Sequence, residues 1–298
     1  MHVLQRLEEH FTRREWLHVD REATRLIMLE SLSDKERGQV YRCWGRAKAG
    51  LNEINAAIRL LEQAAHYAQR EQDWDCLGFA RADLGALYTT IGNLSSGMDC
   101  LRAYLTDLDR YEEAATCQGK VRFNLALAYK YRRQYREAVS YYREALDWFT
   151  LRGLTTELGM AHRNLAWLYC ILNQLEEART HLELADTYRD TLTPEFDAEQ
   201  ICCWAFYYWK AGKVGSAMDC VQEILLTGRP GVDAHHRGQA ALIGGHIALL
   251  LGQRTTAEQL LDLAMCAAID TNDRALAEEC TELRGKLDSA GGGGGTAG

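Results

Sequence analysis

A short pattern recurs along the chain about every forty residues, and this repeat constrains the fold more than any other feature. Each copy begins with a large apolar residue, a small one and an aromatic. After a short polar turn, a second small residue is followed by apolar residues four and seven positions later. That second small residue stands in steps of 40, 41, 40, 39 and 40, at Ala57, Gly97, Ala138, Ala178, Ala217 and Ala257. A period of this length is typical of a solenoid of stacked two-helix units.

Each half of the repeat has the apolar spacing of one helix face. The first half is clearest at Leu125–Tyr129, and the second at Tyr135–Leu146. The small residues let the two helices approach closely, and the aromatic residues fill the gap to the neighbouring unit. Because a single pair of helices does not bury its apolar face alone, the units have to stack.

These residues resemble the tetratricopeptide repeat, in a long form of about 40 rather than about 34 residues. The resemblance is strongest at 118–224, good at 78–110 and 235–270, and degenerate at 1–75. It implies an all-α, right-handed superhelical solenoid of about seven helical hairpins, forming one domain over 1–289 with well-matched repeats at 78–270. Residues 274–288 are predicted to cap the stack as a further helix, and the glycine-rich tail 290–298 to be disordered.

Composition excludes several classes of protein. The net charge of −8 argues against nucleic-acid binding over the whole surface. No apolar stretch is long enough to span a bilayer, and the start of the chain has no apolar signal core, so a cytoplasmic location is expected. The ten cysteines include no Cys-x-x-Cys pair. They are predicted to be reduced thiols packed as small core residues.

No catalytic motif is present in the sequence. It contains neither a Gly-x-Ser-x-Gly elbow nor a phosphate-binding glycine loop. Asp233, His235 and His236 come nearest to a metal site, but adjacent histidines at a helix start point in different directions and lack further ligands at the required spacing. They are predicted to form a solvated helix start. We therefore expect no enzymatic activity, no cofactor and no bound metal.

The first helix of each unit lines the concave face of a tetratricopeptide stack, and this groove is the candidate functional site. Residues offset from the packing positions of these first helices are expected to face the groove. The predicted peptide-binding set is Lys120, Phe123, Asn124, Leu127, Lys130, Tyr131, Arg163, Asn164, Trp167, Phe206, Trp209 and Lys210.

Two asparagines distinguish this set from an ordinary solvated face. Asn124 and Asn164 occupy the same repeat position, one place before the packing leucine. A side-chain amide both donates and accepts hydrogen bonds, so an exposed asparagine is able to hold a peptide unit. The resemblance to peptide-binding tetratricopeptide proteins implies this role for both residues. For either asparagine taken alone, an exposed position without a function remains the alternative.

Charge and apolar side chains complete the predicted groove. The four cations of the set add positive potential suited to a carboxylate, and its aromatic residues supply apolar pockets. Asp83 stands in the third unit where a matching asparagine is expected, which disfavours recognition of one defined C-terminal tail.

Two functions follow from this groove. The first is a regulatory receptor or adaptor that binds an extended peptide or protein segment, similar to the repeat domains of bacterial peptide-responsive regulators. The second is a constitutive scaffold that assembles a protein complex without a small peptide ligand. In both, the partner is a peptide or protein and not nucleic acid or a membrane, and a homodimer stays open. A groove-binding peptide would raise the melting temperature by mass action, whereas a scaffold would respond only to a folded partner.

Overall fold

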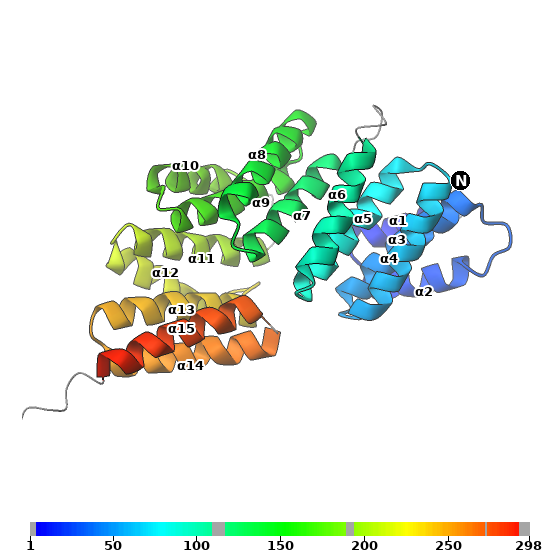
Figure 1. Ribbon diagram of the computed structural model, residues 1–298. Coiled ribbons are helices and arrows are strands. Elements are labelled where there is room, and N and C mark those ends of the chain that lie inside the picture. The colour runs from blue at the N-terminus through cyan, green and yellow to red at the C-terminus, as the bar shows by residue number, and fades with distance from the viewer. Residues whose placement is uncertain (1–3, 109–116, 189–193, 272, 292–298) are drawn as a thin grey trace, which may run out of the picture. The chain divides into compact units, whose positions relative to one another are not determined.

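The computed structural model describes residues 4–108, 117–188, 194–271 and 273–291, which form fifteen α-helices (Figure 1). No strand occurs among these residues. The chain divides into two compact units, unit 1 (residues 1–148) and unit 2 (residues 149–298), and the boundary falls within α8. The predicted all-α architecture of helical hairpins is confirmed.

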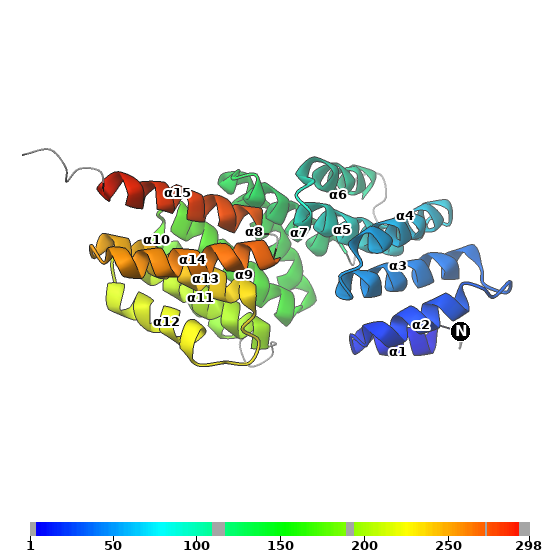
Figure 2. The same ribbon diagram turned by 90° about the horizontal axis from the view of Figure 1, so that it is seen from below.

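The helices alternate with short turns throughout the described chain. Unit 1 contains α1 (Gln5–Thr12), α2 (Trp16–Leu26), α3 (Asp34–Gly50), α4 (Ile54–Arg70), α5 (Trp74–Thr90), α6 (Leu94–Leu108), α7 (Gln118–Tyr131) and most of α8 (Tyr135–Arg152). Unit 2 contains α9 (Thr155–Ile171), α10 (Leu175–Asp186), α11 (Pro194–Lys210), α12 (Val214–Leu226), α13 (Ala234–Leu250), α14 (Arg254–Thr271) and α15 (Arg274–Gly291). Consecutive helices form seven hairpins, and α15 packs against both helices of the last one (Figures 1 and 2). The rest of the glycine-rich tail, 292–298, lies outside the described residues.

The first hairpin closes at Arg14, whose φ is 55°, and each of the other six closes with one further residue in the left-handed backbone conformation. These six residues have φ between 58° and 79°, and they are Asn52, Gly92, Arg133, Asn173, Gly212 and Gly252. Their spacing of 40, 41, 40, 39 and 40 repeats that of the small residues in the second helices. Glycine and asparagine adopt this conformation at low cost, which explains why they mark five of the six turns.

The small residues of the repeat lie at the contacts between paired helices. All six second-helix marker residues, from Ala57 to Ala257, are buried. In the hairpin of α5 and α6, a β-carbon added to Gly85 would stand 2.5 Å from Cγ of Leu101, and one added to Gly97 would stand 3.0 Å from the carbonyl oxygen of Gly85. The two backbones therefore approach as closely as the sequence pattern predicted.

Buried thiols and a terminal apolar face complete the packing. Seven of the ten cysteines are buried, which fits their predicted use as small core residues. The last helix, α15, buries Leu276, Cys280, Leu283 and Leu287 in the core cluster that it shares with α13 and α14. None of the described helices is long and apolar enough to cross a membrane.

Candidate functional site

The first helices of successive hairpins contact one another within each unit. In unit 1 these contacts join α3 to α5 and α5 to α7, and in unit 2 they join α9 to α11, α11 to α13 and α13 to α15. Figure 1 shows α9, α11 and α13 as successive layers of unit 2. Side chains at the contacts between first helices form what we call the inner face of each unit.

Unit 2 brings together four of the predicted site residues. The rings of Trp167 on α9 and Phe206 on α11 stack with centroids 4.3 Å apart. The ring of Trp209 lies 5.6 Å from that of Phe206. The ammonium group of Lys210 stands 5.6 Å from the Phe206 centroid and 4.9 Å from the Trp209 centroid.

A fifth residue, His246 on α13, extends this row of rings. Its imidazole stacks on Trp209 with centroids 4.6 Å apart and planes 26° from parallel. We call Trp167, Phe206, Trp209 and His246 the aromatic ladder. The ladder crosses three first helices without a gap. Two of its contacts are stacked, an arrangement that aromatic pairs prefer.

The repeat explains why the ladder forms. Trp167, Phe206 and His246 occupy the same repeat position, 39 and 40 residues apart. Trp209 follows Phe206 by three residues and therefore lies on the same side of α11. The repeat position of His246 also predicts that it faces the groove, although the predicted peptide-binding set did not include it.

Two cationic side chains, Lys210 and Lys286, lie near the ladder. Lys210 is exposed at the end of α11. Burial, followed by the positive charges of Lys286 and Lys210, lowers the pKa of His246 to about 4. The imidazole is therefore neutral at pH 7, and the two ammonium groups leave a positive potential at this end of the inner face. Such a potential suits a carboxylate more than a second cation.

Arg163 does not supply the exposed charge that was predicted for it. Its guanidinium is 8 % exposed, forms an ion pair with Glu199 and lies 4.5 Å from the ring centroid of Phe196. Because α9 packs against α11, the arginine contacts side chains of the next first helix before it reaches solvent. The expectation of a free groove cation at this position is wrong.

Unit 1 has a different inner face, organised by one buried carboxylate. Asp83 on α5 is 2 % exposed. Its Oδ1 accepts a hydrogen bond from Lys120 Nζ on α7 at 2.6 Å and pairs with Arg46 Nη1 on α3 at 3.4 Å. Lys120 is therefore paired within the unit, and the positive potential that it was predicted to give a guest is largely neutralised.

Asn124 is buried, not exposed. It retains 7 % of its accessible surface, and its Nδ2 donates to the carbonyl oxygen of Ala82 at 2.7 Å. The prediction of an exposed side chain is wrong because α7 packs so closely on α5 that this position meets the neighbouring backbone. Asn164, the equivalent residue in unit 2, is half-buried, and its Nδ2 donates to the carbonyl of Met160 in its own helix at 2.9 Å.

These two environments predict different stability effects. Asn124→Ala removes a buried bond between helices and is expected to cost about 0.5–1.5 kcal/mol of unfolding free energy. Asn164→Ala, the control at the same repeat position, is expected to cost less because Asn164 is half-buried whereas Asn124 is buried. Urea unfolding of both variants measures the difference, and equal losses would contradict the assignment.

The remaining predicted residues of unit 1 are spread over several environments. Phe123 is half-buried and meets the ring of Tyr142 on α8 edge-on at 5.0 Å, so it contacts the second helix of its own hairpin. Leu127 and Lys130 are half-buried, and Tyr131 is 44 % exposed at the end of α7. These four residues therefore do not share one environment.

A cavity of about 150 Å³ also opens in unit 1, and nothing in the repeat pattern indicated it. Arg42 lies between the rings of Phe11 and Phe79, at 5.5 and 5.3 Å from their centroids. The cavity is lined by Leu4, Leu7, Glu8, Gln39, Arg42, Cys43, Asp73, Asp75, Cys76 and Phe79.

The histidine pair at the start of α13 is a structural feature. Asp233 caps the helix by accepting from the backbone N–H of His236 at 3.0 Å. His236 is only 3 % exposed, and His235 pairs with Asp273 at 3.2 Å. The predicted helix start is present, but the expectation that it is solvated is wrong for His236, which is buried.

Comparisons with known proteins identify the fold. No family model and no curated protein matches the sequence. Among solved structures, a tetratricopeptide repeat protein from Parabacteroides merdae matches with a TM-score of 0.60 at 12% identity, over 94% of this chain and 96% of that one. The apo form of RapI matches with a TM-score of 0.68 at 10% identity, over 89% of this chain and 96% of that one.

A further match is a Rap protein complexed with competence and sporulation factor. Its TM-score is 0.66 at 14% identity, over 92% of this chain and 74% of that one. Sequence identities this low establish the fold alone. The chain therefore has the fold of tetratricopeptide repeat proteins.

Proposed function

We propose that the protein is a non-enzymatic interaction module whose unit 2 binds an extended peptide or protein segment on its inner face. The observation that carries this proposal is the aromatic ladder of Trp167, Phe206, Trp209 and His246, with the exposed ammonium of Lys210 beside it. A regulatory receptor or adaptor is the role that such a surface fits best.

The chemistry of the ladder is that of a binding surface. Trp167, Trp209 and His246 are half-buried, so part of each residue remains in contact with water. Covering this surface with a guest chain is favourable, and tryptophan is among the residues that most often dominate binding energy at interfaces. Lys210 and Lys286 then favour a guest with an acidic group near Trp209 and His246.

The solved structures support an interaction role without defining its partner. The fold serves as a platform for many partners, so the fold alone identifies none of them. The Rap protein of the comparison was solved with a bound factor, and the apo form of RapI shares the same fold. By analogy, we assign to this chain a groove that takes up a chain segment.

Peptide selection tests the proposal directly. Peptides selected from a random display library on the full chain are expected to lose about 30-fold or more in affinity for Trp209→Ala, the loss typical of a hot-spot residue. Gln222→Ala, an exposed position on α12, is the matched control and is expected to bind unchanged. Isothermal titration with the selected peptides measures all three proteins.

Two outcomes would count against peptide binding. Selected peptides that bind Trp209→Ala as tightly as the original chain would place their site elsewhere. A library that yields no binding peptide, and none that raises the melting temperature, would favour the constitutive scaffold.

A further inference from the structure

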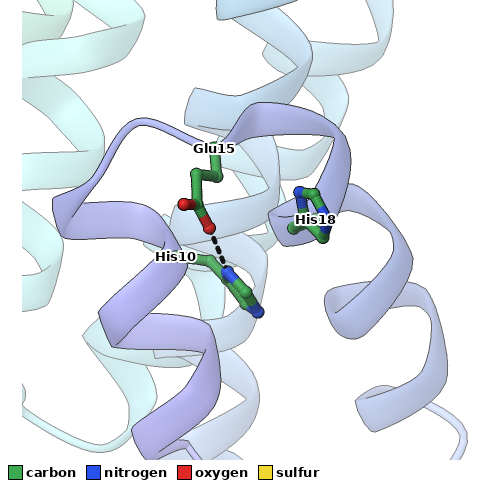
Figure 3. Close-up of side chains that lie close together, drawn as sticks. All are labelled: His10, Glu15 and His18. Carbon is green, nitrogen blue, oxygen red and sulfur yellow. Dashed lines mark hydrogen bonds and ion pairs between the residues drawn. The ribbon is translucent and has the colours of Figure 1, made fainter.

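Three side chains of the kind that bind transition metals meet at the turn between α1 and α2. His10 lies in the last turn of α1, Glu15 precedes α2, and His18 lies in the first turn of α2. One ligand atom from each residue lies within 4.8 Å of the other two. Figure 3 shows the carboxylate of Glu15 directed at the ring of His10, with the ring of His18 beside them.

The backbone of the turn holds these residues together. Arg14 adopts the left-handed conformation with φ of 55°, which reverses the chain between the two helices. The N–H of Glu15 then donates to the carbonyl of His10 at 3.0 Å, and the N–H of His18 donates to the carbonyl of Glu15 at 2.9 Å. Main-chain hydrogen bonds therefore connect the three residues, and their side chains project from the same side of one tight turn.

The side chains are already partly organised. Nδ1 of His10 lies 2.5 Å from Oε2 of Glu15, and the rings of His10 and His18 stack with centroids 5.0 Å apart. This contact orients the Glu15 carboxylate toward the imidazole of His10.

We propose that His10, Glu15 and His18 bind one Zn²⁺ ion, with two imidazole nitrogens and one carboxylate oxygen as ligands. Zinc accepts this donor set, and imidazole suits zinc better than the hard cations that prefer oxygen alone. His18 is exposed and His10 and Glu15 are half-buried, so their side chains have room to close on an ion. An ion bound at Nδ1 of His10 replaces the hydrogen bond to Glu15, and the neutral imidazole then carries its proton on Nε2.

The ion would connect the two helices of the first hairpin. His10 belongs to α1, which is only eight residues long, and the other two ligands belong to the α2 side of the turn. A helix this short is marginal without tertiary contacts. Buried Leu7 of α1 packs in one core cluster with Val19 and Ala23 of α2. Metal binding would therefore order the terminal hairpin of unit 1, independently of the ladder in unit 2.

Zinc titration of the full, reduced chain without an affinity tag tests this site. Isothermal titration is expected to show one strong equivalent of Zn²⁺. Loss of an outer-shell partner lowers the affinity of a metal site by roughly 10–100-fold. His18→Ala removes a direct ligand and is expected to lower the Zn²⁺ affinity by at least as much. His10→Ala is expected to do the same. His66→Ala, an exposed histidine of α4, is the matched control and is expected to leave the affinity unchanged.

Two further measurements separate this site from cysteine binding and from a folding defect. Co²⁺ bound at the site is expected to show no sulfur-to-metal charge-transfer band, and Cys266→Ser, which removes the exposed thiol, is expected to retain binding. Zn²⁺ is also expected to slow amide exchange in α1 and α2 of the original chain but not in α1 and α2 of His18→Ala. Because the side chain of His18 is exposed, its removal is not expected to disturb folding. The proposal would be overturned if His10→Ala and His18→Ala bound Zn²⁺ as tightly as the original chain, or if Cys266→Ser lost binding.

Discussion

Gly78→Ala is expected to destabilise unit 1 by about 1–3 kcal/mol, the usual cost of overpacking a well-filled core. A β-carbon on Gly78 of α5 would stand 2.1 Å from Sγ of Cys117 and 2.4 Å from Cζ and Oη of Tyr104. These atoms have little room to move. Tyr104 is fully buried, and its hydroxyl lies 2.8 Å from Sγ of Cys117 and donates to the carbonyl of Trp74 at 3.2 Å.

Gly38→Ala is the matched control, because Gly38 is the equivalent residue of α3, forty positions earlier. A β-carbon there meets only ordinary contacts, the nearest being Cβ of Tyr67 at 3.4 Å. Alanine exceeds glycine in helix propensity by about 1 kcal/mol, so this variant is expected to be neutral or more stable. Urea unfolding with amide exchange resolved on unit 1 measures both variants. A stable Gly78→Ala would show that α5 and α6 pack less tightly than described.

Acid is expected to destabilise unit 2 between about pH 6.5 and pH 4. Burial and then the neighbouring His181 lower the pKa of His162 to about 4, and burial with Lys286 and Lys210 does the same for His246. The unfolded chain binds these protons near pH 6.5, before the folded chain does. Stability from both histidines is therefore fully present above that pH and is lost as the pH falls to 4. At about 1.36 kcal/mol per pKa unit, each contributes on the order of 3 kcal/mol.

His235 acts in the opposite direction. The hydrogen bond to Asp273 raises the pKa of His235, so its contribution is present at low pH and is lost as the pH rises through the folded value. Variants are therefore needed to isolate the two buried histidines.

Unfolding free energies between pH 4 and 7 test the acid effect. His162→Gln and His246→Gln are each expected to flatten the pH dependence, whereas His66→Gln, which replaces an exposed histidine of unit 1, is expected to leave it unchanged. An unaltered slope in both unit 2 variants would show that neither imidazole is kept neutral by burial.

The repeat by itself determined the succession of helices and turns. Steps of about forty residues located the hairpins, and the small residues from Ala57 to Ala257 lie at helix contacts because only small side chains fit there. Glycine and asparagine marked most of the turns, since these residues tolerate positive φ. Part of the candidate site followed the same logic: Trp167 and Phe206 share a repeat position, and the stacking of α9 on α11 brings their rings together.

Only the tertiary structure decided which polar side chains remain exposed. Asn124 and Arg163 lie on the sides of first helices that periodicity assigns to the groove, yet both are buried. Periodicity gives the direction in which a side chain leaves its helix, but the distance to the next helix sets what that side chain meets. Asn124 meets the backbone of α5, and Arg163 meets Glu199 of α11. At the equivalent glycines 38 and 78, an added β-carbon would meet ordinary contacts in the first case and filled space in the second. That distance depends on the residues of two neighbouring repeats together, so one repeat read alone does not contain it.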